Sequence, residues 1–182
     1  MKATIVDGQE IANKLIEKIR SLSQNSTPKK ICFVSFGASP ASKSFVEKKM
    51  NTARELGIIA QSVEKSASTT DEAVDFLNDL SKQGYEGIVV QMPVGKDLDT
   101  NTILNSIPES QDIDLLSDIA KESYKSGKTE RTPPVARAFD EIIRRYAIDI
   151  SGKKLVVLGF GRLVGKPISI LLHKTSVPHE ML

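Results

Sequence analysis

The sequence has one cysteine, no tryptophan and no excess of either charge, and each shortage narrows the classes of protein it can encode. Cys32 lies in an apolar run and cannot form an internal disulfide, so we expect a buried thiol in a reducing compartment. The formal net charge is +2 without a basic stripe, so nucleic acid is not an expected partner. No apolar run reaches membrane-spanning length and no signal peptide opens the chain, so we expect a soluble, cytoplasmic protein without a membrane partner.

The apolar residues are sufficient for a core, since 40% of the 182 residues are hydrophobic. Their spacing predicts helices over 11–19, 42–56, 70–80 and 98–107, and strands over 31–36, 58–63 and 87–92. Thr70 is the expected cap of the third helix, and Ser39 or Ser42 that of the second. Helices alternating with strands predict an α/β fold with a parallel sheet.

A change in composition predicts a second domain. Residues 108–116 are acidic and irregular, and 118–131 are polar with poor periodicity. We therefore place one domain over 1–117 and another over 118–182. The second is expected to contain a helix over 132–146, a strand over 155–158 and a helix from about 165. Residues 175–182 show no strand character.

The segment from Lys154 to Leu172, KLVVLGFGRLVGKPISILL, combines a short strand, three glycines and a helix. This order is typical of the first half of a nucleotide-binding βαβ unit, in which glycines let the backbone approach a pyrophosphate at a helix N-terminus. The spacing G-x-G-x-x-x-G is one residue longer than the common fingerprint, and Pro167 after Lys166 excludes a Walker loop. A purely structural turn explains the glycines equally well.

Two polar residues interrupt apolar patterns. Lys49 shares a helix face with Phe45, Ala53 and Leu56. Desolvation on this face disfavours the charged ammonium form, which suits a lysine to proton transfer. Alternatively, the side chain extends along its stem and carries the ammonium group to water. Gln91 ends a buried strand, at the sheet edge where open α/β sheets bind ligands; alternatively, its amide bonds only to loop backbone. Spacing alone leaves open whether the two side chains face one cleft.

Several pieces of the chain match one family in order and separation. They are Asp7-Gly8 with Ile11-Ala12, Gly37 with Pro40-Ala41-Ser42, Phe45-Val46 with Lys49, Gly87 with Val90-Gln91 and Pro93, Asp112-Ile113-Asp114, Thr132-Pro133, and Gly159 through Pro167. Together they resemble the bifunctional methylenetetrahydrofolate dehydrogenase/methenyltetrahydrofolate cyclohydrolase family along essentially the whole chain.

The resemblance implies oxidation of 5,10-methylenetetrahydrofolate by NADP or NAD, followed by hydrolysis of the methenyl cation to 10-formyltetrahydrofolate. Lys49 matches the catalytic lysine, which handles protons and supports the cation, and Gln91 matches the glutamine that hydrogen-bonds it. Asp114 matches the aspartate that binds the pterin-like ring. Phe45 stands where the family usually has a tyrosine that stacks on the aminobenzoyl group, and it keeps the ring without the hydroxyl.

The resemblance also implies that residues 1–117 form the folate-binding catalytic domain and that 118–182 begin a Rossmann-like NAD(P)-binding domain. The implied cofactor residues are Gly159, Gly161, Arg162, Leu163, Val164, Gly165 and Pro167. Phe160 replaces an arginine that often binds the 2′-phosphate of NADP, and Arg162 can substitute, so NADP against NAD stays open. No metal is expected, and a homodimer is expected for the full-length form.

The chain also departs from the family pattern. Leu115 replaces a glycine after Asp114, which removes backbone freedom from that turn. Gln111 replaces a lysine, Glu130-Arg131 replaces proline and cysteine, and Val135 replaces a glycine. Family members continue well beyond Leu182, so we expect a fragment; the alternative is a shortened protein with a damaged dehydrogenase half.

Two other functions stay open at this point. One is a shikimate-type two-domain dehydrogenase, against which Asp112-Ile113-Asp114 and Gln91-Met92-Pro93 argue. The other is a catalytically impaired folate-binding or partner-binding module, which the changes at Phe45 and Leu115 favour.

Overall fold

The chain forms two compact units, residues 1–111 and residues 112–182. The structure is a computed structural model that describes residues 3–23, 26–37 and 40–182. Ser39, one of the two expected caps of the second helix, lies outside the described residues. The sequence predicts a domain boundary after residue 117. The division into compact units does not test that boundary, which stays a prediction.

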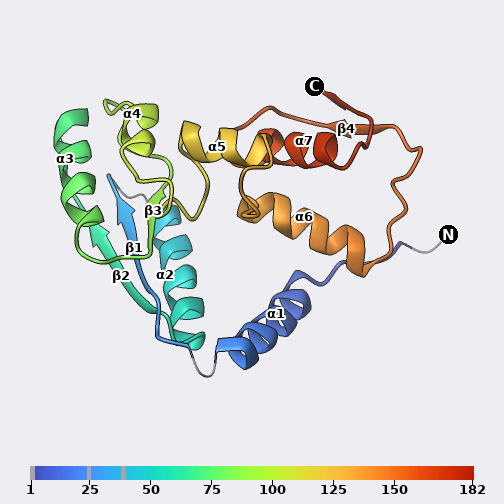
Figure 1. The fold of residues 1–182 in the computed structure, drawn as a ribbon, viewed down its shortest axis with the longest axis horizontal. Helices are drawn as coiled ribbons and strands as arrows, with labels where there is room; N and C mark the ends of the chain where they lie inside the picture. The colour runs from blue at the N-terminus through green and yellow to red at the C-terminus, as the bar shows by residue number, and fades with distance from the viewer. Residues whose placement is uncertain (1–2, 24–25, 38–39) are drawn as a thin grey trace. The chain divides into compact units, whose positions relative to one another are not determined.

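A parallel three-stranded sheet forms the centre of the first unit (Figure 1). β1 (Lys30–Ser35) is the middle strand and pairs in parallel with β2 (Ile59–Glu64) and with β3 (Gly87–Gln91). The last four residues of β1 and the first four of β3 are buried, as expected where both faces of a sheet are covered. The predicted α/β fold with a parallel sheet is confirmed.

Four helices accompany this sheet: α1 (Gly8–Ser23), α2 (Pro40–Glu55), α3 (Thr70–Ser81) and α4 (Thr100–Asn105). α2 covers one face of the sheet and α3 the other (Figure 1). The ring of Phe36, just after β1, meets that of Phe76 on α3 edge-on, with centroids 6.3 Å apart. Leu77 of α3 is fully buried, which stabilises the fold by about 1.5–3 kcal/mol.

The observed cap of α3 differs from the expected one. Thr69, not Thr70, caps α3, because Thr69 Oγ1 accepts a hydrogen bond from Glu72 N at 3.2 Å. Thr70 Oγ1 instead accepts from Asp99 N at 2.8 Å. Ser42 lies inside α2, which begins at Pro40. The expectation for Thr70 was wrong because neighbouring hydroxyl residues have equal capping chemistry, and only the backbone decides which one is used. Of the two caps expected for the second helix, Ser42 is excluded by its place inside α2, and Ser39 is not tested.

The single thiol is inert in this fold. Cys32 lies in β1 with no exposed surface, and burial raises the pKa of its thiol to about 11. The buried cysteine expected from the apolar run is confirmed.

The second unit contains α5 (Asp118–Lys125), α6 (Pro134–Arg145), β4 (Leu155–Val157), α7 (Gly165–Lys174) and β5 (His179–Met181). β4 and β5 pair in parallel, with Leu155 opposite His179, so strand, glycine loop, helix and strand form the expected start of a Rossmann-like unit. Within the described ranges, no helix is long and apolar enough to cross a membrane.

The expectation that residues 175–182 lack a strand was wrong. Leu182 N donates to Val157 O at 3.1 Å, and Gly159 N donates to Leu182 O at 2.7 Å, which extends the pairing of β4 with β5. β5 has only three residues, His179 and Glu180 among them, and so shows no alternation of apolar side chains. Its strand character is visible only from its pairing with β4.

α5 and α7 pack against each other through apolar and polar contacts. Leu115, Ala120 and Tyr124 form a buried cluster, and Ile170 of α7 packs against it. Lys174 Nζ donates to Tyr124 O at 2.7 Å and lies 4.5 Å from the centroid of the Tyr124 ring. The helix that follows the glycine loop is therefore held against the segment that follows Asp114.

Leu115 adopts a backbone conformation that normally favours glycine. Its φ is +53°, and its side chain is only 2% exposed. The left-handed region costs an L-residue about 1–2 kcal/mol, and burial of a leucine offsets this by about 1.5–3 kcal/mol. The backbone turn for which the family pattern has a glycine is thus kept with a leucine in its place. Packing of the leucine side chain offsets the backbone strain.

Substitutions at position 115 separate strain from packing. We expect Leu115→Ala to destabilise the fold by about 2–5 kcal/mol, since it loses the packing and keeps the strain. Leu115→Gly should be about 1 kcal/mol more stable than Leu115→Ala, because glycine relieves the positive φ. Urea unfolding followed by circular dichroism measures both; an alanine variant as stable as the glycine variant would show that this turn is unstrained.

Glu141 is a buried carboxylate on α6 between two arginines. Arg144 Nη2 donates to Glu141 Oε2 at 2.7 Å, and Arg145 Nε donates to Glu141 Oε1 at 2.5 Å. These hydrogen bonds lower the pKa of Glu141 to about 2. The ion pairs therefore hold the carboxylate in its charged form through most of the acid range.

Acid should weaken this contribution. Because the folded pKa of Glu141 lies below its ordinary value of 4.5, the stabilisation is present above pH 4.5 and is lost as pH falls toward 2. We expect the Tm difference between the wild type and Glu141→Gln to shrink over that interval. Asp140→Asn is the control, because Asp140 lies 3.8 Å from Arg137 and is more exposed. A Glu141→Gln difference that stays constant with pH would contradict this assignment.

Candidate active site and nucleotide loop

Lys49 and Gln91 meet at the carboxyl end of β3. Lys49 Nζ donates a hydrogen bond to Gln91 Oε1 at 3.3 Å, although 42 residues separate the two in the chain. Gln91 Nε2 donates to Met92 O at 3.0 Å, so the amide can present only its oxygen to the lysine. The structure brings the two candidate residues together, and it shows that the amide also bonds to loop backbone.

Packing of α2 determines where Lys49 points. Val46 and Ala53, one turn before and one turn after Lys49, are buried, which seats this side of α2 against the sheet. Lys49 is half-buried, and its Nζ lies 5.8 Å from the centroid of the Phe33 ring on β1. A lysine nitrogen held here by an amide oxygen can exchange protons with a molecule bound at this end of the sheet.

Phe45 lies four residues before Lys49, on the same side of α2. Its side chain is 61% exposed. An exposed aromatic ring one turn from Lys49 offers a flat apolar surface on which a planar ligand can stack.

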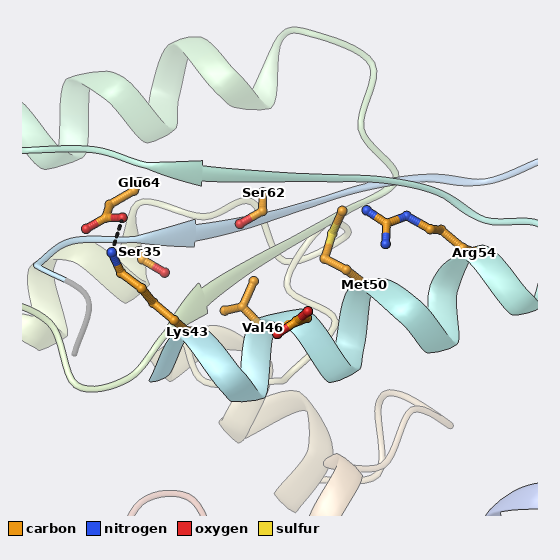
Figure 2. A pocket seen from close by; sticks show the side chains of 8 residues that line it. Ser35, Lys43, Val46, Met50, Arg54, Ser62 and Glu64 are labelled. Atoms are coloured by element: carbon orange, nitrogen blue, oxygen red, sulfur yellow. Dashed lines mark ion pairs between the residues drawn. The ribbon is translucent and has the colours of Figure 1, made fainter. Parts of the chain in front are cut away.

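A separate hollow of about 360 Å³ lies on the β2 side of α2 (Figure 2). Lys43 and Glu64 form an ion pair of 3.0 Å at one end of it, and Arg54 lies at the other end. The residues that line it are Ser35, Lys43, Val46, Glu47, Met50, Arg54, Ser62 and Glu64. Lys49 and Gln91 do not line this hollow, so it is distinct from the paired lysine and glutamine.

In the second unit, Asp114 lies in a turn that the side chain of Asp112 closes. Asp112 Oδ1 accepts from Leu116 N at 3.2 Å, and Oδ2 accepts from Ser117 N at 2.7 Å. Asp112 is buried, whereas Asp114 is half-buried. A hollow of about 380 Å³ adjoins the turn and is lined by Ile113, Leu115, Glu130, Arg131, Thr132 and Arg137.

The loop between β4 and α7 is so tight that only glycine fits at position 165. A Cβ there would lie 1.9 Å from the backbone oxygen of Gly159, which itself has a φ of +90°. Lys166 N donates to Gly161 O at 3.1 Å, and α7 begins without a side-chain cap. In this loop Arg162 is half-buried, Leu163 and Val164 are exposed, and Pro167 is buried.

This loop fits a dinucleotide. A glycine turn that brings strand and helix into close contact, followed by a helix start without a side-chain cap, is the arrangement that receives a pyrophosphate. Among the residues that the structure describes, no group of three or more His, Cys, Asp or Glu side chains is arranged to hold a metal ion.

Comparison with known proteins decides the family. The family profile described as "Tetrahydrofolate dehydrogenase/cyclohydrolase, catalytic domain" matches residues 6–114, more than half of the chain. The chain belongs to the tetrahydrofolate dehydrogenase/cyclohydrolase family. The resemblance drawn from the sequence motifs is confirmed, and the shikimate-type alternative falls away.

Relatives in the tetrahydrofolate dehydrogenase/cyclohydrolase family align with most of the chain. The Bifunctional protein FolD of Chlamydia muridarum is 35% identical over 153 residues, which are 82% of this chain and 53% of the relative. The Bifunctional protein FolD of Borreliella afzelii is 35% identical over 183 residues, which are 97% of this chain and 60% of the relative. The chain thus spans between about half and two thirds of the length of the relatives it matches.

A solved structure of the family has the same fold. It is the crystal structure of Trypanosoma brucei N5,N10-methylenetetrahydrofolate dehydrogenase-cyclohydrolase (FolD) complexed with NADP cofactor and inhibitor. The TM-score is 0.85 at 26% sequence identity, and the match covers 100% of this chain and 65% of that one.

Sequence reasoning missed the side chains that shape the Asp114 turn. Asp112 carried a usable signal, because an aspartate shortly before a helix start is typical of a side chain that accepts from first-turn amides. Arg131 carried none, since its partner, the backbone oxygen of Asp112, lies 19 residues earlier in the chain.

Two glycines of the loop between β4 and α7 provide a matched test of its tightness. We expect Gly165→Ala to destabilise the fold by about 1–3 kcal/mol, because the new methyl group must displace the Gly159 carbonyl. Gly161→Ala should stay within about 0.5 kcal/mol of the wild type, since nothing lies within 4 Å of its added Cβ. Urea unfolding compares the two variants; equal stabilities would contradict the close approach.

Proposed function

We propose that this chain carries the folate-handling site, and the beginning of the cofactor site, of an enzyme in one-carbon metabolism. The enzyme oxidises 5,10-methylenetetrahydrofolate to 5,10-methenyltetrahydrofolate with NADP or NAD and hydrolyses the product to 10-formyltetrahydrofolate. The 3.3 Å hydrogen bond between Lys49 Nζ and Gln91 Oε1 carries the proposal. Family membership supports it, as do relatives named as bifunctional proteins.

In the hydrolytic step, water attacks the bridge carbon of the methenyl cation, and a proton must leave that water. We assign this proton transfer to Lys49, whose nitrogen is held by Gln91 at the ligand-binding edge of the sheet. Gln91 is the positioning partner: its oxygen accepts from Lys49, and its own NH₂ group is held by Met92 O. A lysine kept in one direction can meet the reacting water without a large loss of side-chain entropy.

Two further residues are assigned to folate binding. Phe45 supplies a stacking surface for the aminobenzoyl ring, in keeping with its 61% exposure. Asp114 supplies a carboxylate that accepts hydrogen bonds from the pterin-like ring. Its turn is closed by Asp112, which supports a fixed direction for this carboxylate.

For the cofactor, we assign the pyrophosphate to Gly159, Gly161 and Gly165 and to the loop residues Arg162, Leu163, Val164 and Pro167. A bound nicotinamide would accept the hydride that leaves the one-carbon bridge. The tight Gly159–Gly165 approach supports this assignment, because it brings the start of α7 close to the end of β4, the arrangement in which a helix N-terminus meets a pyrophosphate. Arg162 is the residue we assign to discrimination between NADP and NAD.

A catalytically silent folate-binding module is the second candidate. The loss of a hydroxyl at Phe45 beside Lys49 favours it, because the stacking surface is kept while polar chemistry near the lysine is reduced. The proposal also includes a cytoplasmic location, a small-molecule folate as partner and a homodimer in the full-length form.

Separate substitutions of two adjacent lysines on α2 test the proposal. We expect Lys49→Met to lower the rate of methenyltetrahydrofolate hydrolysis by about 10²–10⁴-fold, the usual contribution of a positioned proton-transfer group. Lys48→Met is the control, because Lys48 is exposed and adjacent on the same helix. The measurement is the loss of methenyltetrahydrofolate absorbance with the 182-residue chain.

Three outcomes decide between the candidates. A rate that depends on Lys49 and not on Lys48 supports the enzyme. Folate binding without any Lys49-dependent rate supports the silent module. Dinucleotide binding without folate binding would contradict both.

A further inference from the structure

We propose that Arg131 is a positioning residue that holds the turn bearing Asp114, and thereby sets the affinity for the pterin-like ring. The inference rests on the proposed function, in which Asp114 binds that ring. The juxtaposition that carries it is a hydrogen bond of 3.2 Å from Arg131 Nη1 to the backbone oxygen of Asp112.

The turn is closed at both ends through Asp112, by its side-chain carboxylate and by its backbone oxygen. The Asp112 carboxylate accepts from Leu116 N and Ser117 N on the far side of Asp114. The Asp112 backbone oxygen accepts from Arg131 on the near side. Asp114 therefore lies inside a loop whose entry is held by Arg131 and whose exit is held by the Asp112 side chain.

The turn needs such support because it is strained. Leu115, the residue after Asp114, has a φ of +53° and a buried side chain. A strained conformation persists only where its surroundings enforce it. Beyond the turn, Ser117 Oγ accepts from Ala120 N at 3.3 Å and starts α5, so the exit of the turn continues directly into a helix.

Arg131 is itself held in place and so can act as a brace. Its backbone N–H donates to Thr129 Oγ1 at 3.2 Å, and its Nε donates to the same oxygen at 3.5 Å. The side chain is half-buried, which strengthens a charge-assisted hydrogen bond relative to one in water. Arg131 also lines the hollow beside the turn, so direct contact with a ligand is the competing explanation.

Arg137 is the matched control. It lines the same hollow with the same guanidinium group, but its side chain is 69% exposed and its ion pair is with Asp140 on α6. A general effect of positive charge in the hollow would therefore appear in variants of both arginines, whereas a brace of the turn belongs to Arg131 alone.

The experiment uses the 182-residue chain with Arg131→Ala, Arg131→Lys, Arg137→Ala and Asp114→Asn. Calorimetric titration with 5-formyltetrahydrofolate, a stable reduced folate, gives Kd. Hydrogen exchange of the Leu116 and Ser117 amides, followed by NMR without folate, reports the turn itself. A preserved thermal transition in Arg131→Lys guards against simple misfolding.

We expect Arg131→Ala to raise Kd about tenfold and to speed exchange of both amides. Arg131→Lys, which keeps a cationic donor, should recover part of each effect, and Arg137→Ala should change neither. A raised Kd with unchanged amide exchange would overturn the inference in favour of direct ligand contact. An unchanged Kd in Arg131→Ala, with binding lost in Asp114→Asn, would overturn it while leaving the proposed function intact. A wild-type chain that binds no reduced folate would overturn the proposed function and this inference together.

Discussion

The hydrogen bond between Lys49 and Gln91 is the interaction on which the chemistry proposed for the first unit depends. It joins the middle of α2 to the end of β3, so it forms only if the helix lies correctly on the sheet. That placement comes from apolar burial: Val46 and Ala53 seat α2, and the buried residues of β1 and β3 form the surface beneath it. Non-directional burial fixes the elements, and one directional bond then fixes the Lys49 nitrogen.

The second unit follows a different principle, because its functional candidates lie in turns whose backbone is constrained. Leu115 is kept at a positive φ by burial against its cluster, and position 165 is restricted to glycine by the Gly159 carbonyl. Strain of this kind costs free energy locally and is balanced by packing nearby. The same α7 that follows the glycine loop also packs, through Ile170, against the cluster that contains Leu115. The helix after the glycine loop and the Asp114 turn thus share one small core.

The fold and the two candidate residues Lys49 and Gln91 were accessible from sequence for a physical reason. Long amphipathic helices and buried strands repeat their signal over many residues, and Lys49 and Gln91 stand out because each breaks such a repeat. β5 was missed because three residues carry no period, and its strand character comes from pairing with β4. Thr69 was missed because Thr70 offers the same hydroxyl one residue later. The brace from Arg131 to Asp112 depends on contact between distant positions, which a single sequence does not encode locally.

The burial of Cys32 has a practical consequence for spectroscopy. The chain has a single cysteine, and that thiol has no exposed surface and a pKa of about 11. Reagents that require a thiolate will therefore not react with Cys32 near neutral pH. A cysteine introduced at the exposed Lys48 position would take a maleimide fluorophore selectively, without removal of the native residue. The dye would then be attached one residue from Lys49, on the same helix.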